Sequence, residues 1–146
     1  MERFNEVLRS GDLLYHLGDV GWSSFPVGTG FLNRLNTKEV FLILGNHDKE
    51  AKMKQYPFRW IRELTSLSID KQQVILCHYA MRTWRNKGHG AFQLYGHSHA
   101  KLPGLGRQMD VGVDTHGFRP WAWEEIRDIL GKIPYSPIEE EEHENS

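Results

Sequence analysis

The sequence contains one cysteine, Cys77, in 146 residues. A single thiol cannot form a disulfide within the chain, so a small fold held together by disulfides is excluded, as is a zinc site built from several cysteines. No apolar run approaches the ~20 residues of a membrane span, and the first residues lack the basic and then apolar order of a signal peptide. These absences favour a cytoplasmic protein with no membrane association.

Net charge is also small. The formal charge is -1, but five glutamates at positions 139–142 and 144 account for the sign, and without them the balance is +4. A mildly basic body suits an anionic substrate such as a phosphoester, although scattered solvated lysines and arginines explain so small a charge equally well. Length and composition predict one domain over residues 1–132 and an acidic, disordered tail over residues 133–146.

Hydrophobic periodicity predicts helices that alternate with strands. The expected helices lie before residue 10 and over 31–36, 49–55 and 123–130. The expected strands lie over 13–17, 39–44, 64–69, 73–77, 91–95 and 109–113. This order predicts an α/β fold with mixed sheets, or a sandwich of two sheets, flanked by helices. Residues 80–90 are basic and aromatic and contain glycine, which predicts an exposed loop.

Polar side chains stand directly after four of these strands. The four segments are Gly18-Asp19, Gly45-Asn46-His47-Asp48, His78 and Gly96-His97-Ser98-His99. Groups beyond the carboxyl ends of strands are well placed to share one site. Carboxylate, amide and imidazole donors without thiolates suit manganese, iron or zinc. Each segment alone is a weak signal, but four in this order predict a metal centre.

The four segments resemble the motifs of the calcineurin-like metallophosphoesterase superfamily, and most closely those of its small bacterial and phage-type members. The motifs of that family run Asp-x-His, Gly-Asp, Gly-Asn-His-Asp/Glu, His and Gly-His-x-His, and the last four match here. The resemblance implies the calcineurin-like fold and a phosphodiesterase or phosphatase that uses a metal-activated hydroxide on phosphodiesters or nucleotides. It also implies two divalent ions, manganese first, with iron, zinc, nickel or cobalt as alternatives.

The resemblance implies a role for each matching residue. The implied metal ligands are Asp19, Asn46, His78, His97 and His99. Among them Asp19 would bridge two ions, and His99 would bind the first ion. His47 would stabilise or protonate the leaving oxygen, and Asp48 would orient His47.

The front of the family pattern has no counterpart here, because no Asp-x-His precedes Asp19. We therefore expect the first strand of the fold and two ligands of the first metal to be missing. His16 lies within a strand, three residues before Asp19. We expect its side chain to point away from the metal centre and to pack as an ordinary strand histidine. We expect one firmly bound ion, weak activity and a homo-oligomer that covers the exposed strand edge. The alternative function is a non-catalytic remnant that binds a metal or a protein partner.

Three residues of the 80–90 segment are candidate substrate contacts. Arg82 and Arg85 could bind a phosphate, and Trp84 could stack on a base, although a solvated loop is an equally good interpretation. Direct nucleic-acid binding without chemistry is disfavoured, because it would leave the metal motifs unused.

Two further residues are expected near the site. Asp114 and His116 follow an apolar strand, and we predict that they support the metal centre. Trp121 and Trp123 are assigned to core packing rather than to ligand contacts.

Overall fold

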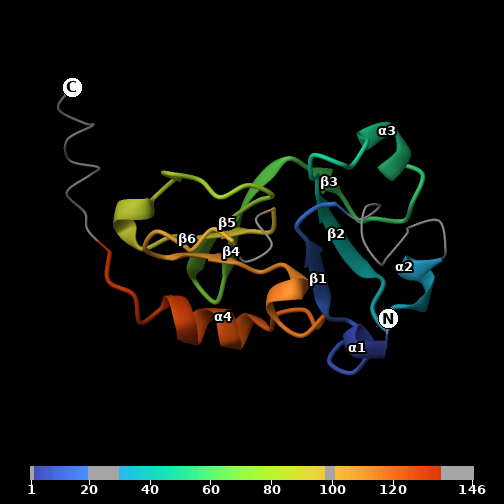
Figure 1. The fold of residues 1–146 in the computed structure, drawn as a ribbon. Helices are drawn as coiled ribbons and strands as arrows, with labels where there is room; N and C mark the ends of the chain where they lie inside the picture. The colour runs from blue at the N-terminus through green and yellow to red at the C-terminus, as the bar shows by residue number, and fades with distance from the viewer. Residues whose placement is uncertain (1, 20–29, 98–100, 136–146) are drawn as a thin grey trace.

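The computed structural model describes residues 2–19, 30–97 and 101–135. Two β-sheets lie side by side, with helices on their outer sides (Figure 1). Sheet A has the order β1-β2-β3, with all strands parallel, and consists of β1 (Leu13–His16), β2 (Glu39–Ile43) and β3 (Ile61–Arg62). Sheet B has the order β4-β5-β6-β7 and consists of β4 (Leu64–Ile69), β5 (Gln72–Cys77), β6 (Phe92–Tyr95) and β7 (Gln108–Asp110). The predicted α/β class with mixed sheets is confirmed.

Both faces of sheet A are covered, as the apolar character of its strands requires. Leu14 and Val40 pack with Phe4 of α1 (Glu2–Asn5) and Phe31 of α2 (Phe31–Arg34). Met53 of α3 (Glu50–Met53) packs against β2 on the same side of the molecule. On the other face lies a row of aromatic rings, which consists of Tyr15 of β1, Phe41 of β2 and Trp60, the residue before β3.

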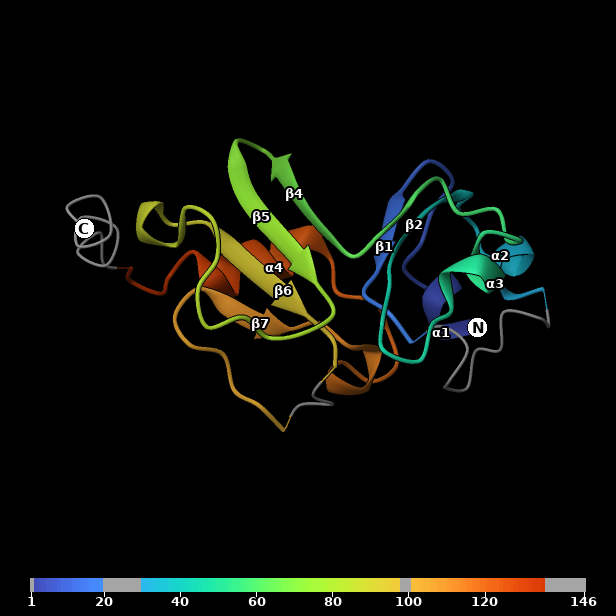
Figure 2. The ribbon, with the colours of Figure 1, turned by 90° about the horizontal axis from the view of Figure 1, so that it is seen from above.

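Sheet B begins with the predicted hairpin. The two residues between β4 and β5, Asp70 and Lys71, have φ angles of 50° and 66°, which is the signature of a type I′ turn. From β5 onward the strands are parallel. Helix α4 (Trp123–Leu130) lies along one face of the sheet, where Ile126 and Leu130 enter the main core (Figure 2).

The opposite face of sheet B is covered by the segment that was predicted to be an exposed loop. Trp84 is only 5% exposed and packs with Ile75 and Ala91. Its indole N–H donates a hydrogen bond to the Ala91 carbonyl at 2.9 Å. The burial of the indole contradicts the prediction that Trp84 contacts substrate. Among the described residues no α-helix packs on this face of the sheet, and the indole covers it instead.

The folded body extends beyond the predicted boundary at residue 132. Arg107 donates a hydrogen bond to the Ile133 carbonyl at 2.7 Å, and its guanidinium lies 4.5 Å from the centre of the Tyr135 ring. Residues 136–146, the remainder of the tail predicted over 133–146, lie outside the described residues. Within the described part of the chain, no helix is long and apolar enough to cross a membrane.

Replacing Trp84 with phenylalanine should test its assignment to the core. The substitution removes the hydrogen bond to Ala91 and part of the buried ring, and we expect it to lower the free energy of unfolding by about 1–3 kcal/mol. The measurement is urea denaturation followed by circular dichroism. Arg85→Ala, at an exposed neighbouring position, is the control and should change stability by less than about 0.5 kcal/mol. Equal stability of W84F and the parent protein would contradict the assignment.

Candidate metal centre

The strand ends that carry the predicted ligands meet where the two sheets touch. β1 and β2 are parallel neighbours in sheet A, and β5 and β6 are parallel neighbours in sheet B, so each pair ends at one edge. Nδ1 of His78, after β5, lies 2.6 Å from the carbonyl oxygen of Leu17, after β1. The backbone N–H of His97, after β6, donates to the His78 carbonyl at 2.9 Å. The contact between His78 and Leu17 joins sheet B to sheet A, and the bond between His97 and His78 joins the two loops of sheet B.

Four polar side chains, called here the polar cluster, lie at this junction, and they are Asp19, Asn46, His78 and His97. Nε2 of His78 is at the centre. It lies 3.0 Å from Oδ1 of Asn46, 3.0 Å from Nδ1 of His97 and 3.3 Å from Oδ2 of Asp19. Possible ligand atoms of Asp19, His78 and His97 all lie within 4.8 Å of one another. The structure thus brings together the four residues predicted to surround the second metal, and metal binding by them stays a prediction.

The protonation pattern of His78 makes this arrangement suitable for a cation. The Leu17 carbonyl can only accept a hydrogen bond, so in the neutral ring Nδ1 carries the hydrogen and Nε2 carries a lone pair. That lone pair faces the Asn46 and Asp19 oxygens, and three electron-rich atoms converge without a hydrogen on Nε2 to join them. A divalent cation would satisfy all of them, and the hydrogen bond from Nδ1 holds the ring as metal-binding histidines usually require.

Two glycines allow the ligand loops to approach each other. Gly18 has a φ of 107°, and a Cβ there would lie 2.5 Å from Nδ1 of His78. A Cβ on Gly45 would lie 2.5 Å from the amide nitrogen of Asp19 and would also collide with the Asp19 carboxylate. Asp19 itself has a left-handed φ of 59°, which is uncommon for a residue other than glycine. The glycines that precede Asp19 and Asn46 are therefore needed for space.

Asp48 holds Asp19 in this unusual conformation. Its Oδ2 accepts two hydrogen bonds, at 2.7 Å from the Asp19 N–H and at 2.8 Å from the Gly45 N–H. The His47 N–H in turn donates to Oδ1 of Asp19 at 3.0 Å. A carboxylate that accepts two amide hydrogen bonds is a strong anchor. The family resemblance implies that Asp48 orients His47. The observed contacts give Asp48 another role, because it links the loop of Asp19 to the loop of Gly45.

Tyr79 is a site residue that the sequence reasoning missed. Its ring packs against His78 at a centroid distance of 5.0 Å and against His97 at 4.9 Å, so it limits rotation of both imidazoles. The ring is nearly half exposed. Nothing in the sequence pattern distinguishes Tyr79 from any aromatic residue after a strand, and only its position beside His78 could have suggested it.

His16 lies closer to the site than predicted. Its Nδ1 accepts a hydrogen bond from the Gly18 N–H at 3.1 Å, which places the ring against the loop that leads to Asp19. Burial lowers the pKa of His16, while the nearby carboxylates of Asp48 and Asp19 act in the opposite direction. His16 therefore supports the loop through Nδ1 as a packed strand histidine, and it is not in the group of possible ligands formed by Asp19, His78 and His97.

The sequence comparison agrees with this geometry. The family model for the calcineurin-like phosphoesterase superfamily domain matches residues 1–113. The chain belongs to the calcineurin-like phosphoesterase superfamily. Members of this superfamily are usually phosphoester hydrolases and generally use divalent metal ions.

The structural comparison supports the same fold. The chain is similar to the crystal structure of a protein of unknown function, AQ665, from Aquifex aeolicus, with a TM-score of 0.68 and 22% sequence identity. The match covers 88% of this chain and 82% of that chain, and at this identity it shows the fold alone. No curated protein matches the sequence.

The remaining predicted residues of this superfamily member are not all at the centre. His99 lies outside the described residues. Asp114 is exposed and lines a cavity that reaches Asp19. His116 instead stacks on Trp121 at a centroid distance of 3.8 Å, and its Nε2 lies 3.3 Å from a Glu125 oxygen.

Arg82 and Arg85, the basic residues of the 80–90 segment that were predicted to contact substrate, lie at different places relative to the polar cluster. Arg85 precedes Asn86, whose side chain donates to Gln73 at 2.6 Å. Gln73 lies at the start of β5, and His78 follows the other end of that strand. This contact places the neighbourhood of Arg85 away from the polar cluster, so the structure gives no support to a substrate contact there. Arg82 is exposed and closer along the chain to His78.

Alanine substitutions of two motif glycines should show whether steric conflict with Asp19 lowers the metal affinity of this centre. Gly45→Ala should weaken Mn²⁺ binding by ~10–100-fold, because the new methyl group displaces Asp19. Gly96→Ala is the matched control, since a Cβ there would meet only Leu17 atoms, both at an ordinary 3.5 Å. Isothermal titration calorimetry of the two folded variants is the measurement. Equal loss of affinity in both would show that the predicted conflict with Asp19 does not control binding.

Proposed function

We propose that this protein is a metal-dependent phosphoester hydrolase that acts on phosphodiesters or nucleotides. The observation that carries the proposal is the convergence of Asp19, Asn46 and His97 on Nε2 of His78. Such a cluster of oxygen and nitrogen donors, at the meeting point of four strand ends, has the composition of a site for a divalent transition metal. Membership of the superfamily supplies the reaction class.

Manganese is the ion that we propose first, with iron, zinc, nickel or cobalt as alternatives. The polar cluster would hold it, and Tyr79 would keep both imidazoles oriented. When bound, a divalent ion supplies positive charge that polarises phosphoryl oxygens and lowers the pKa of water. Asp19 can serve a second ion with its other oxygen, although that oxygen also accepts the His47 N–H at 3.0 Å.

His47 is proposed to act on the leaving group. It follows Asn46 directly, and its side chain is exposed while the central ring of His78 is buried. An exposed imidazole beside a buried metal site can reach the leaving oxygen of a bound ester and donate a proton to it. Asp48 positions the backbone on both sides of His47 through its hydrogen bonds to Gly45 and Asp19.

A second candidate function is a non-catalytic metal-binding protein of the same fold. It is favoured by a specific observation: within residues 2–19, 30–97 and 101–135, one group of three histidine or acidic ligands has the spacing of a metal site. Phosphoester hydrolysis in this fold is expected to use two ions. Metal stoichiometry and turnover together distinguish the two functions.

The proposed reaction predicts metal-dependent hydrolysis of bis-p-nitrophenyl phosphate. The protein stripped with a chelator should be inactive, and Mn²⁺ should restore turnover. Asp19→Asn should abolish both tight Mn²⁺ binding and turnover, because an amide removes one negative charge and one ligand oxygen. The measurement is release of p-nitrophenolate, together with metal content by mass spectrometry. Tight binding of one ion without turnover on phosphodiesters or phosphomonoesters would contradict the hydrolase and favour the second candidate.

His47→Ala should separate catalysis from metal binding. Because His47 is assigned to the leaving group, the variant should lose turnover by ~100-fold or more, while its Mn²⁺ content stays at the level of the parent protein. His89→Ala is a matched control, since His89 is also exposed but lies in the 3-10 helix Lys87–His89 before β6. Loss of Mn²⁺ from the His47 variant would instead make His47 a ligand.

A further inference from the structure

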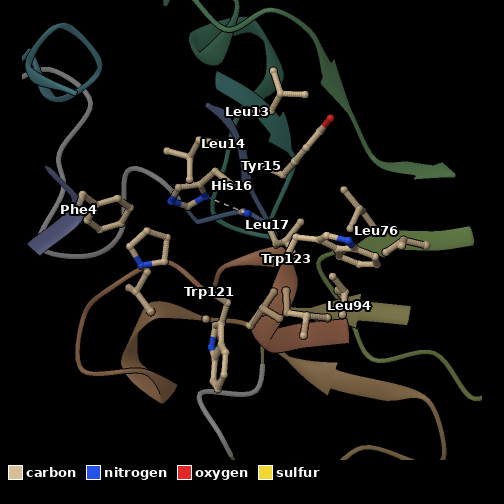
Figure 3. A pocket seen from close by; sticks show the side chains of 18 of the residues that line it. Phe4, Leu13, Leu14, Tyr15, His16, Leu17, Leu76, Leu94, Trp121 and Trp123 are labelled. Atoms are coloured by element: carbon tan, nitrogen blue, oxygen red, sulfur yellow. Dashed lines mark hydrogen bonds between the residues drawn. The ribbon is translucent and has the colours of Figure 1, made fainter. Parts of the chain in front are cut away.

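Two glutamines, Gln93 of β6 and Gln108 of β7, lie opposite each other on the face of sheet B that Trp84 covers. They are 0% and 4% exposed. Successive side chains of a strand point to opposite faces, and Leu94, the residue after Gln93, lines the apolar cavity of about 390 Å³ on the other face (Figure 3). The glutamines are thus polar groups in the core of the domain, where their amides need hydrogen-bond partners.

The amide of Gln93 has a partner for both of its hydrogens and for both acceptor positions of its oxygen. Its Oε1 accepts hydrogen bonds from the Met81 N–H at 3.2 Å and from Nε2 of Gln108 at 2.6 Å. Its Nε2 donates to the carbonyls of Tyr79 at 3.3 Å and of Leu94 at 2.9 Å. Nε2 of Gln108 also donates to the Met81 carbonyl at 2.6 Å. The two side chains therefore bind the backbone of residues 79–81.

Residues 78–84 need such partners, because they belong to no helix or strand. The His78 carbonyl, at the start of this segment, accepts the N–H groups of Gly96 and His97 at 3.1 and 2.9 Å. Gln93 then binds the carbonyl of Tyr79. The planar peptide groups on both sides of the Tyr79 Cα are therefore hydrogen-bonded, which limits rotation about the φ and ψ angles of Tyr79. A buried side chain, rather than a regular element, fixes the place from which the Tyr79 ring extends.

The Tyr79 ring extends to the metal centre, where it packs against the imidazoles of His78 and His97. We propose that Gln93 and Gln108 are positioning residues of this centre, which hold the main chain of Tyr79 so that its ring keeps the two imidazoles in place for a divalent ion. Neither glutamine belongs to the polar cluster, so both act through Tyr79. This inference rests on the proposed function, since it assumes that the polar cluster holds an ion.

Gln93→Met tests the proposal in the metal-free full chain. Methionine is similar in volume to glutamine and apolar, so it fills the same space and removes the hydrogen bond to the Tyr79 carbonyl. The ring-proton NMR signals of His78 and His97 should move in the direction in which Tyr79→Leu moves them, because both changes take the Tyr79 ring away from the imidazoles. Unchanged histidine signals in the folded Gln93→Met variant would overturn the proposal.

Thr65→Val is the matched control for a lost hydrogen bond in sheet B. Thr65 of β4 is also buried, and its hydroxyl accepts a hydrogen bond from Arg62 at 3.0 Å. This variant should leave the histidine signals unchanged, and equal movement in Thr65→Val and Gln93→Met would overturn the proposal. If Gln93→Met does not fold, Gln108→Met repeats the test, because it also removes a hydrogen bond to residues 79–81. Unchanged signals in that variant would then overturn the proposal.

Mn²⁺ affinity, measured by isothermal titration calorimetry, gives a second readout that does not depend on turnover. Gln93→Met and Tyr79→Leu should each weaken binding by ~10-fold, and the double variant should lose no more than Tyr79→Leu alone, because both changes act through one ring. Losses that multiply in the double variant would overturn the proposal. A protein that shows this coupling but hydrolyses no phosphoester contradicts the proposed function and supports the positioning role, so the two proposals can fail separately.

Discussion

The hydrogen bond between His78 and the carbonyl of Leu17 is the interaction on which the rest of the site depends. It joins a residue that follows β5 in sheet B to a residue that follows β1 in sheet A, at 2.6 Å. The same bond decides which nitrogen of His78 faces Asn46, Asp19 and His97. One contact therefore sets both the junction of the two sheets and the chemistry at its centre.

The loops around this bond are held in one conformation by backbone hydrogen bonds and close contacts. Asp48 accepts hydrogen bonds from two loops at once, and Gly18 and Gly45 give those loops the room to touch. The left-handed conformation of Asp19 is an uncommon one for a residue with a side chain, and the Asp48 carboxylate offsets its cost. A site with such support is largely formed before any ion arrives, which reduces the entropy lost on binding.

Much of this organisation could be predicted from sequence because it is local. Apolar runs of four to six residues followed by Gly-Asp, Gly-Asn-His-Asp or Gly-His define strands and their exits, and the Asp70-Lys71 turn defines a hairpin. The contribution of Trp84 could not be predicted, because its burial depends on a sheet face against which no α-helix of the described residues packs. The positions of His16 and Tyr79 depend on how the two sheets meet, and that contact cannot be predicted from a local sequence pattern.

The residues of the polar cluster are far apart in the sequence, from Asp19 to His97, and they belong to loops after four different strands. Their contacts can form only after the parallel pairings of β1 with β2 and of β5 with β6 have formed, each at an entropic cost in the unfolded chain. An ion that binds the folded cluster and not the separated side chains adds its binding free energy to the stability of the whole domain. Metal concentration would thereby act on the fraction of molecules that are folded, and the abundance of this protein in a cell would follow the supply of its ion.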